Sequence, residues 1–365
     1  MIKDKVTAVF FKLLRSGLWN TPIDENNSLL LSDEEWEALF VLCVNQTVEA
    51  IVFDALERLN PSFLPPKHIL LKWVVRVEKI VQRNMVMNSV INEQIALFEK
   101  SGIHAVLLKG QGLATLYENP DSRTCGDIDW YFSNEKEYTI ACKLIRDMQL
   151  EISQTAGYSA CYVWKGIETD HHQRIFDIYN PFCRSFLKKL EKNEYKNNIH
   201  VRAKDSTWTL PAPVLNILQV NTHILKHQLS FGIGLRQLCD AARLYYVHHH
   251  YLDGAYLKKV YTKVGIIRWI YLLHDILHRY IGLPKDYLPF DTLPGYPADW
   301  MMTDMLRSGN FGFHDHKFRT DNDQQTFRKS KTQKIAGNFF KYLRYAPMEA
   351  ISFPLVQLYS GWRIK

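Results

Sequence analysis

The pattern of hydrophobic and polar positions divides the chain into three stretches. Over residues 1–102 the apolar positions recur at helical spacing. The longest run, residues 68–100, is amphipathic and stops before Gly102, a residue that commonly follows the end of a helix. Ser32, followed by Glu35 three residues later and by an apolar run, has the form of a capping box. The first stretch is therefore predicted to be helical.

The periodicity changes at residue 104. Short apolar runs with strand character occupy residues 104–110, 127–132, 161–166 and 173–180. Segments 112–119 and 136–148 between them suit helical turns and a helix, and the polar segment 167–172 is interpreted as a turn between the last two strands. Alternating strands and helices over about 80 residues predict a compact mixed unit.

After Pro181 the chain returns to helical spacing, with three long runs at 214–228, 235–250 and 266–283. We therefore expect an α+β protein with a small mixed-sheet core between two helical regions. Its predicted parts are an N-terminal helical region (1–102), the α/β core (103–182) and a C-terminal helical region with a basic tail (183–365).

Composition adds little to this picture. The 365 residues are 47% hydrophobic and 23% charged, and the net charge of +7 permits anionic partners without specifying nucleic acid. The six cysteines form no CxxC pair, so neither a disulfide framework nor a zinc knuckle is expected. The N-terminus lacks the features of a signal peptide, and charges interrupt the apolar run 266–283. We expect a cytoplasmic protein without stable membrane insertion.

Two aspartates in one apolar run are the first chemical signal. On a strand, Asp127 and Asp129 project from the same face while Ile128 faces the other side. Neighbouring carboxylates raise each other's pKa unless a cation compensates them, and Mg²⁺ is bound in this way by carboxylates and substrate phosphates. The alternative is an exposed acid pair at a strand end.

The residues upstream strengthen the first interpretation. Lys109, Gly110 and Gln111 lie where a strand passes into a helix, a place where free backbone N–H groups accept a phosphate. Lys109 and Arg123 add two cations that could neutralise a triphosphate. Alone, this turn is also compatible with an ordinary tight turn beside solvated side chains.

A third carboxylate is expected at Asp177, between two large apolar residues in the predicted strand 173–180. An acid in mid-strand is explained if it faces the same metal site as the first two. Glu168 and Asp170 compete with it, but they fall in the segment interpreted as a turn. We therefore favour Asp177.

A glycine turn after one strand, Asp-Ile-Asp on the next and a later strand aspartate together resemble the nucleotidyltransferase fold of DNA polymerase β. The blocks LLKGQGLATLYENPDSRTCGDIDWYF, FDIYN and HILKHQ…GLRQLCDAARL are more closely similar to an uncharacterised nucleotidyltransferase family, NTP-transferase 5, over residues of about 1 to 350. The resemblance implies helical regions on both sides of a catalytic core.

The resemblance also implies an activity. Asp127 and Asp129 would hold two Mg²⁺ ions that bridge the phosphates of a nucleoside triphosphate such as ATP. Asp177 would complete the second metal site and help to deprotonate a hydroxyl acceptor. A nucleoside monophosphate would be transferred to that acceptor and pyrophosphate would leave. The acceptor is not specified: a small molecule, a protein side chain and an RNA end all remain open, as does the oligomeric state.

Three features depart from the pattern of the superfamily. Gln111 stands where a Ser or Gly usually follows the first glycine, so backbone N–H groups, Lys109 or Arg123 would have to bind phosphate. The spacer 112–126 is longer than in many members. Tyr179 stands where relatives often carry the His of an acid-x-His strand. These departures keep open a catalytically degenerate nucleotide-binding or regulatory module of the same fold. An RNA-binding protein that uses the basic tail is the other alternative.

Arg236 and Asp240 lie one helical turn apart, where they can bridge each other or contact nucleotide or acceptor. His223 and His227 have the same spacing, which suits zinc, but no third ligand is evident and a core role is expected. The basic tail, residues 328–344, could lie on RNA or an anionic membrane, although a solvated helix that packs its aromatic residues on the core is expected.

Overall fold

The N-terminal region of the computed structural model is built mainly from α-helices. The structure describes residues 4–154, 159–203, 206–292, 297–312 and 324–363. The helices are α1 (Lys5–Trp19), α2 (Asp33–Gln46), α3 (Glu49–Leu56) and the 34-residue α4 (Lys67–Lys100). The predicted capping box is confirmed, because Ser32 accepts from the N–H of Glu35 and the Glu35 carboxylate accepts from the N–H of Ser32. Within the described ranges no helix has the length and apolar character needed to cross a membrane.

A mixed five-stranded sheet forms the core, in the order β1-β2-β5-β4-β3. The strands are β1 (Val106–Leu108), β2 (Ile128–Tyr131), β3 (Ser153–Gln154), β4 (Ser159–Trp164) and β5 (Ile167–His172). Strands β2 and β5 are parallel, and the other neighbours are antiparallel. The α+β class and the small mixed sheet between helical regions are confirmed.

The interpretation of residues 167–180 was wrong in two respects. Residues 167–172, expected as a turn, form strand β5, whose buried positions are Ile167, Thr169 and His171. Polar residues at two of these three positions hide the alternation that marks a strand. Residues 173–180, expected as a strand, are irregular: the N–H groups of Tyr179 and Asn180 donate to the Glu349 carboxylate at 2.9 and 2.8 Å instead of to a neighbouring strand.

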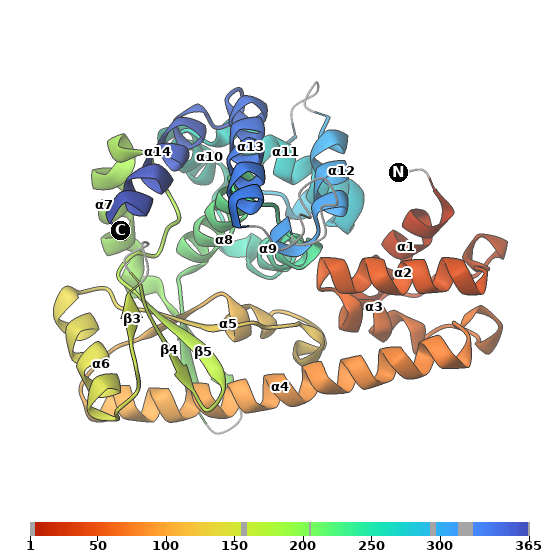
Figure 1. Ribbon diagram of the computed structural model, residues 1–365, viewed down its shortest axis with the longest axis horizontal. Helices are drawn as coiled ribbons and strands as arrows, with labels where there is room; N and C mark the ends of the chain where they lie inside the picture. The colour runs from red at the N-terminus through yellow and green to blue at the C-terminus, as the bar shows by residue number, and fades with distance from the viewer. Residues whose placement is uncertain (1–3, 155–158, 204–205, 293–296, 313–323, 364–365) are drawn as a thin grey trace.

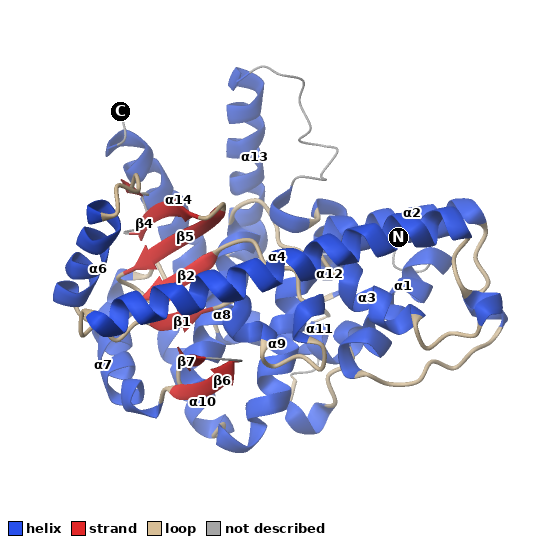
Figure 2. Ribbon diagram, turned by 90° about the horizontal axis from the view of Figure 1, so that it is seen from below, coloured by secondary structure: helices blue, strands red, loops and turns tan. Residues whose placement is uncertain are grey.

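The two faces of the sheet have different neighbours. One face packs on the second half of α4 and on α6 (Glu135–Asp147), in an apolar cluster that includes Ile128 and Trp130 of β2. Figures 1 and 2 show α4 running along this side of the sheet, with most of the C-terminal helices on the other side. Tyr131 belongs to the larger cluster on that other side. Asp129, which alternates with Ile128 and Trp130, therefore faces the C-terminal helices.

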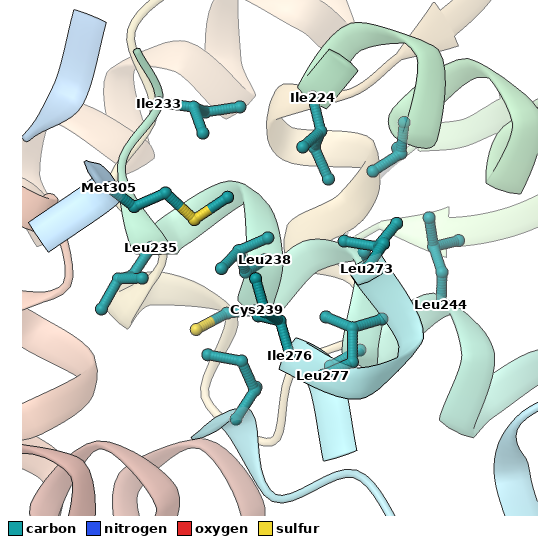
Figure 3. Close-up of a cluster of buried hydrophobic side chains, with 14 of the residues drawn as sticks. Ile224, Ile233, Leu235, Leu238, Cys239, Leu244, Leu273, Ile276, Leu277 and Met305 are labelled. Atoms are coloured by element: carbon teal, nitrogen blue, oxygen red, sulfur yellow. The ribbon is translucent and has the colours of Figure 1, made fainter. Parts of the chain in front are cut away.

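The C-terminal region is mainly helical. It contains α7 (Arg184–Glu194), α8 (Pro213–Leu229), α9 (Leu235–His248), α10 (Gly254–Val264), α11 (Ile267–Ile276), α12 (Asp299–Ser308), α13 (Gln324–Tyr342) and α14 (Pro347–Arg363). Besides the helices it contains an antiparallel hairpin that the sequence analysis did not predict, formed by β6 (Ile199–Ala203) and β7 (Ser206–Leu210). Figure 3 shows the apolar core that α8, α9, α11 and Met305 of α12 share.

The predicted boundary at residue 102 follows the end of α4, but packing crosses it. Trp73 lies in the large cluster with the N-terminal helices, whereas Met87 and Phe98 of the same helix lie under the sheet. In the tail, Tyr342 is buried and Phe339 half-buried, but Phe340 is exposed, so the tail packs only part of its aromatic surface on the core. The side chains of residues 328–332 lie outside the described part of the chain. The three-part division stays a prediction.

Candidate active site

The turn between β1 and α5 (Gly110–Ala114) is built on two consecutive residues with positive φ, Lys109 at +44° and Gly110 at +38°. Only glycine adopts such values freely, so the backbone at Lys109 is strained. A Cβ on Gly110 would lie 3.2 Å from the carbonyl oxygen of Asp127. The glycine therefore lets this turn pack directly against the start of β2, which brings the Lys109 side chain to the aspartate pair.

Asp129 is the buried member of the pair, with 3% of its surface exposed. Its Oδ1 is 3.1 Å from Lys109 Nζ and 2.7 Å from His172 Nε2. Burial alone would raise the pKa of Asp129, but Lys109 and His172 hold it well below the ordinary value. Asp129 is therefore ionised, and its charge is compensated by neighbouring donors.

Asp127 stands at the exposed start of the strand and has the opposite tendency. The negative charge of Asp129 raises the pKa of Asp127 to about 6, although Lys109 and Arg236 oppose this shift. The two aspartates are thus electrostatically different, and Asp127 lies directly before β2 instead of within it. Lys109 and His172 stabilise the ionised form of Asp129, whereas the charge of Asp129 disfavours ionisation of Asp127.

Asp170 lies beside Asp129 in the parallel pairing of β2 with β5. Ligand atoms of Asp129, Asp170 and His172 all lie within 4.8 Å of one another. His171, between them in sequence, points to the other face, where its Nε2 is 2.9 Å from the Tyr162 hydroxyl. The strand therefore presents an acid-x-His pair to the aspartates of β2. The sequence interpretation had set Asp170 aside and had missed this role for His172.

Asp177 lies in the irregular segment after β5 and is held by α8. Its Oδ1 is 2.8 Å from Lys226 Nζ, and its Oδ2 is 2.8 Å from His223 Nδ1. Burial opposes its ionisation, yet Lys226 and His223 keep the pKa of Asp177 well below the ordinary value. His223 thus serves this carboxylate, consistent with a core role. Lys226 carried no signal in the sequence.

Lys109 connects the three aspartates that the sequence singled out. Burial lowers the pKa of Lys109, but the charges of Asp129, Asp177 and Asp127 more than offset this effect and raise it. These residues come from different elements of the fold, and the charges of all three aspartates act on one ammonium group. The structure thus brings Lys109, Gly110 and all three predicted aspartates together.

Three residues predicted to bind nucleotide are engaged in the fold. Gln111 is buried and donates from Nε2 to Asn84 Oδ1 of α4 at 2.9 Å. The guanidinium of Arg123 binds both carboxylate oxygens of Asp240, at 2.8 and 2.7 Å, and both side chains are buried. Tyr117 also donates to Asp240, at 2.6 Å. These contacts favour structural roles, and nucleotide contacts by these residues stay predictions.

Arg236 is the remaining predicted contact. It donates from Nη1 to the carbonyl of Thr124 at 2.7 Å, and its charge partly opposes the rise in the pKa of Asp127. The i, i+4 bridge to Asp240 is replaced by the pairing of Asp240 with Arg123. Arg236 therefore borders the acid cluster, on the side of Asp127.

Comparison with known proteins identifies one protein family that this chain matches. The family described as "Uncharacterised nucleotidyltransferase" matches residues 32–282, more than half of the chain. No curated protein matches this chain in sequence. Among solved structures, an antigenic nucleotidyltransferase-like protein from Paracoccidioides brasiliensis is similar at 12% identity and a TM-score of 0.32. That similarity covers 44% of this chain and 75% of the other, and it is too weak to support an argument.

Arg123→Met is expected to lower the free energy of unfolding by about 3–5 kcal/mol, because it leaves the buried Asp240 carboxylate without its cation. The double variant Arg123→Met/Asp240→Leu should lose less than the sum of the single changes. Urea unfolding measures both. Lys72→Met is the control, since Lys72 pairs with Glu37 on the surface and should change stability by at most about 1 kcal/mol. Unchanged stability with weaker nucleotide binding would assign Arg123 to the ligand instead.

Asparagine substitutions of the two strand aspartates should act in opposite directions in metal-free buffer. Because the folded-state pKa of Asp127 is raised to about 6, ionisation costs stability as the pH rises from about 4 through 6. Asp127→Asn should therefore stabilise the protein at pH 7 by about 1 kcal/mol after solvent screening, and the gain should vanish near pH 4.

Asp129→Asn should instead destabilise the protein at neutral pH by about 1–3 kcal/mol, since Lys109 and His172 lose a charged acceptor. Its folded-state pKa is lowered, so the contribution of the ionised group is lost as the pH falls. Unfolding curves between pH 4 and 8 measure both variants. The same sign for both at pH 7 would contradict the charge distribution described above.

Proposed function

The chain belongs to the uncharacterised nucleotidyltransferase family, and we propose that its acid cluster performs Mg²⁺-dependent nucleotidyl transfer. In this reaction a nucleoside triphosphate donates its nucleoside monophosphate to a hydroxyl acceptor. The oxygen of the acceptor forms a bond to the α-phosphorus, the bond to the β-phosphate breaks, and pyrophosphate leaves. The acceptor proton passes to a nearby base or to water.

The observation that carries the proposal is the in-register placement of Asp129 and Asp170 on neighbouring strands, with His172 beside them. Asp127 directly precedes β2, and its carboxylate interacts electrostatically with Asp129. Neighbouring carboxylates of this kind are difficult to accommodate unless cations accompany them. Oxygen donors of this kind are the ligands that Mg²⁺ prefers, and phosphate oxygens commonly complete its shell. The donor set therefore fits the metal that the family implies.

We propose Asp170 rather than Asp177 as the third metal ligand. Asp170 shares the strand face of Asp129, and it precedes His172 with the acid-x-His spacing that Asp177 and Tyr179 lack. Both oxygens of Asp177 already bind Lys226 and His223. Bound Mg²⁺ would offset the charge of the triphosphate and of the leaving pyrophosphate.

The cations of the chain would act on the phosphates. Lys109 is positioned by the strained turn beside Asp129, and Lys226 is positioned by Asp177. The negative charges of Asp177 and Asp129 both raise the pKa of Lys226. It therefore keeps its charge at neutral pH. We propose that both ammonium groups bind triphosphate oxygens and stabilise the negative charge that develops on the leaving group.

Thermal unfolding with each of the four nucleoside triphosphates, with Mg²⁺ or EDTA, tests the proposal. We expect one triphosphate to stabilise the protein in the presence of Mg²⁺, by about 2.7 kcal/mol at a hundredfold excess over its dissociation constant. Asp127→Ala/Asp129→Ala and Asp170→Asn should each abolish this stabilisation. Asp177→Asn should keep the metal dependence but weaken nucleotide affinity roughly tenfold, because Lys226 loses its anchor.

Glu168→Gln is the matched control, since Glu168 lies on the same strand face as Asp170 but at an exposed position. It should bind nucleotide as the wild type does. If Asp177→Asn abolished the metal dependence and Asp170→Asn did not, the third ligand would be Asp177. Stabilisation that persists in EDTA would favour a degenerate nucleotide-binding module. No stabilisation by any triphosphate would contradict the proposed site.

A further inference from the structure

His172 adds a nitrogen donor to the carboxylates of the acid cluster. It is the last residue of β5, its Nε2 lies 2.7 Å from Asp129 Oδ1, and its side chain is 21% exposed. Ligand atoms of His172, Asp129 and Asp170 all lie within 4.8 Å of one another. The parallel register pairs Asp129 with Asp170, and strand alternation puts His172 on the same face as Asp170. The sheet itself therefore holds this donor set in place.

The separations of the three donors match those around a single metal ion. With bonds of about 2.1 Å, two neighbouring donors on an ion are about 3.0 Å apart and two opposite donors about 4.2 Å apart. The 2.7 Å between His172 Nε2 and Asp129 Oδ1 is close to the first distance, and the 4.8 Å limit of the whole set is close to the second. Small movements of the side chains are enough to place all three donors on one ion.

The imidazole of His172 changes which metal this donor set prefers. Carboxylate and water oxygens are the ligands of hard cations such as Mg²⁺, whereas imidazole binds first-row transition metals. The adjacent His171 does not supply this nitrogen, because its Nε2 faces the Tyr162 hydroxyl on the other side of the sheet. The ammonium of Lys109, 3.1 Å from Asp129 Oδ1, repels a dication and limits its affinity. The contribution of the imidazole to binding is therefore needed.

We propose that His172 is a metal ligand, and that Asp129, Asp170 and His172 together prefer a first-row transition-metal dication to Mg²⁺. This inference deepens the proposed function and rests on it, since the same carboxylates bind the metal in both. The imidazole coordinates through Nε2 as the neutral tautomer, with its proton on Nδ1. Mg²⁺ is bound by the same carboxylates together with water or phosphate oxygens. The two kinds of metal therefore differ in their use of His172.

Titration of the full chain with Mn²⁺ alone, without nucleotide, tests this inference by electron paramagnetic resonance. The signal of the free aqueous ion measures the affinity, and pulsed spectra of the bound ion detect coupling to a coordinated nitrogen nucleus. We expect a saturable site that shows this coupling and that binds Mn²⁺ roughly tenfold more tightly than Mg²⁺. Competition with Co²⁺ should show tighter binding than that of Mn²⁺. The proposal is overturned if Mn²⁺ does not bind saturably or binds without nitrogen coupling.

His172→Asn separates a ligand from a structural residue, because the amide keeps an N–H donor for Asp129 and offers an oxygen in place of the imidazole nitrogen. It should abolish the nitrogen coupling and weaken Mn²⁺ binding roughly tenfold, while Mg²⁺ affinity changes by less than about twofold. Equal losses for both metals would show that His172 only supports the fold of the site.

His104→Asn is the matched control, since His104 also lies beside a carboxylate, that of Glu137, but is exposed on the surface. It should bind both metals as the wild type does and keep the nitrogen coupling. The wild-type spectrum tests the proposal even if His172→Asn does not fold. Stabilisation by a nucleoside triphosphate with Mg²⁺, combined with a Mn²⁺ spectrum that lacks nitrogen coupling, would exclude His172 as a ligand and leave the proposed function standing.

Discussion

The ammonium group of Lys109 is the interaction on which the acid cluster depends. Asp127, Asp129 and Asp177 all act on it electrostatically, and its direct contact is with Asp129. Without a cation among them, three neighbouring carboxylates would shift one another toward the protonated form. Lys109 reaches Asp129 from a turn in which its own backbone has a positive φ. The backbone strain and the charge compensation therefore occur at the same residue, Lys109.

The parallel pairing of β2 with β5 determines which residues join this cluster. Register places Asp170 beside Asp129, and alternation sends His171 to the opposite face, into contact with Tyr162. A shift by one residue would exchange these faces and bury Asp170 under α4 and α6. The buried residues Ile167 and His171 therefore determine the register of β5. This register in turn places Asp170 and His172 on the opposite face of the strand.

The sequence was informative where the rule involved is local. Residues separated by one position share a strand face wherever the strand lies, and a glycine after an apolar run indicates a turn at the end of a strand. Strand β5 was not predicted because Thr169 and His171, which occupy two of its buried positions, have polar side chains. Their burial depends on partners elsewhere, such as Tyr162 for His171. Local periodicity contains no information about such partners.

Pairings between distant parts of the chain could not be predicted for the same reason. Arg123 binds Asp240 across 117 residues, and Lys226 binds Asp177 across 49. Both contacts join the sheet core to a helix of the C-terminal region, and Arg236 of that region partly opposes the rise in the pKa of Asp127. The core between residues 103 and 182 therefore does not balance its own charges: the cation that holds Asp177 and the carboxylate that holds Arg123 both come from outside it. Helices α8 and α9 therefore contribute charged partners to the core residues. The predicted boundary near residue 182 separates elements of the fold, but ion pairs cross it.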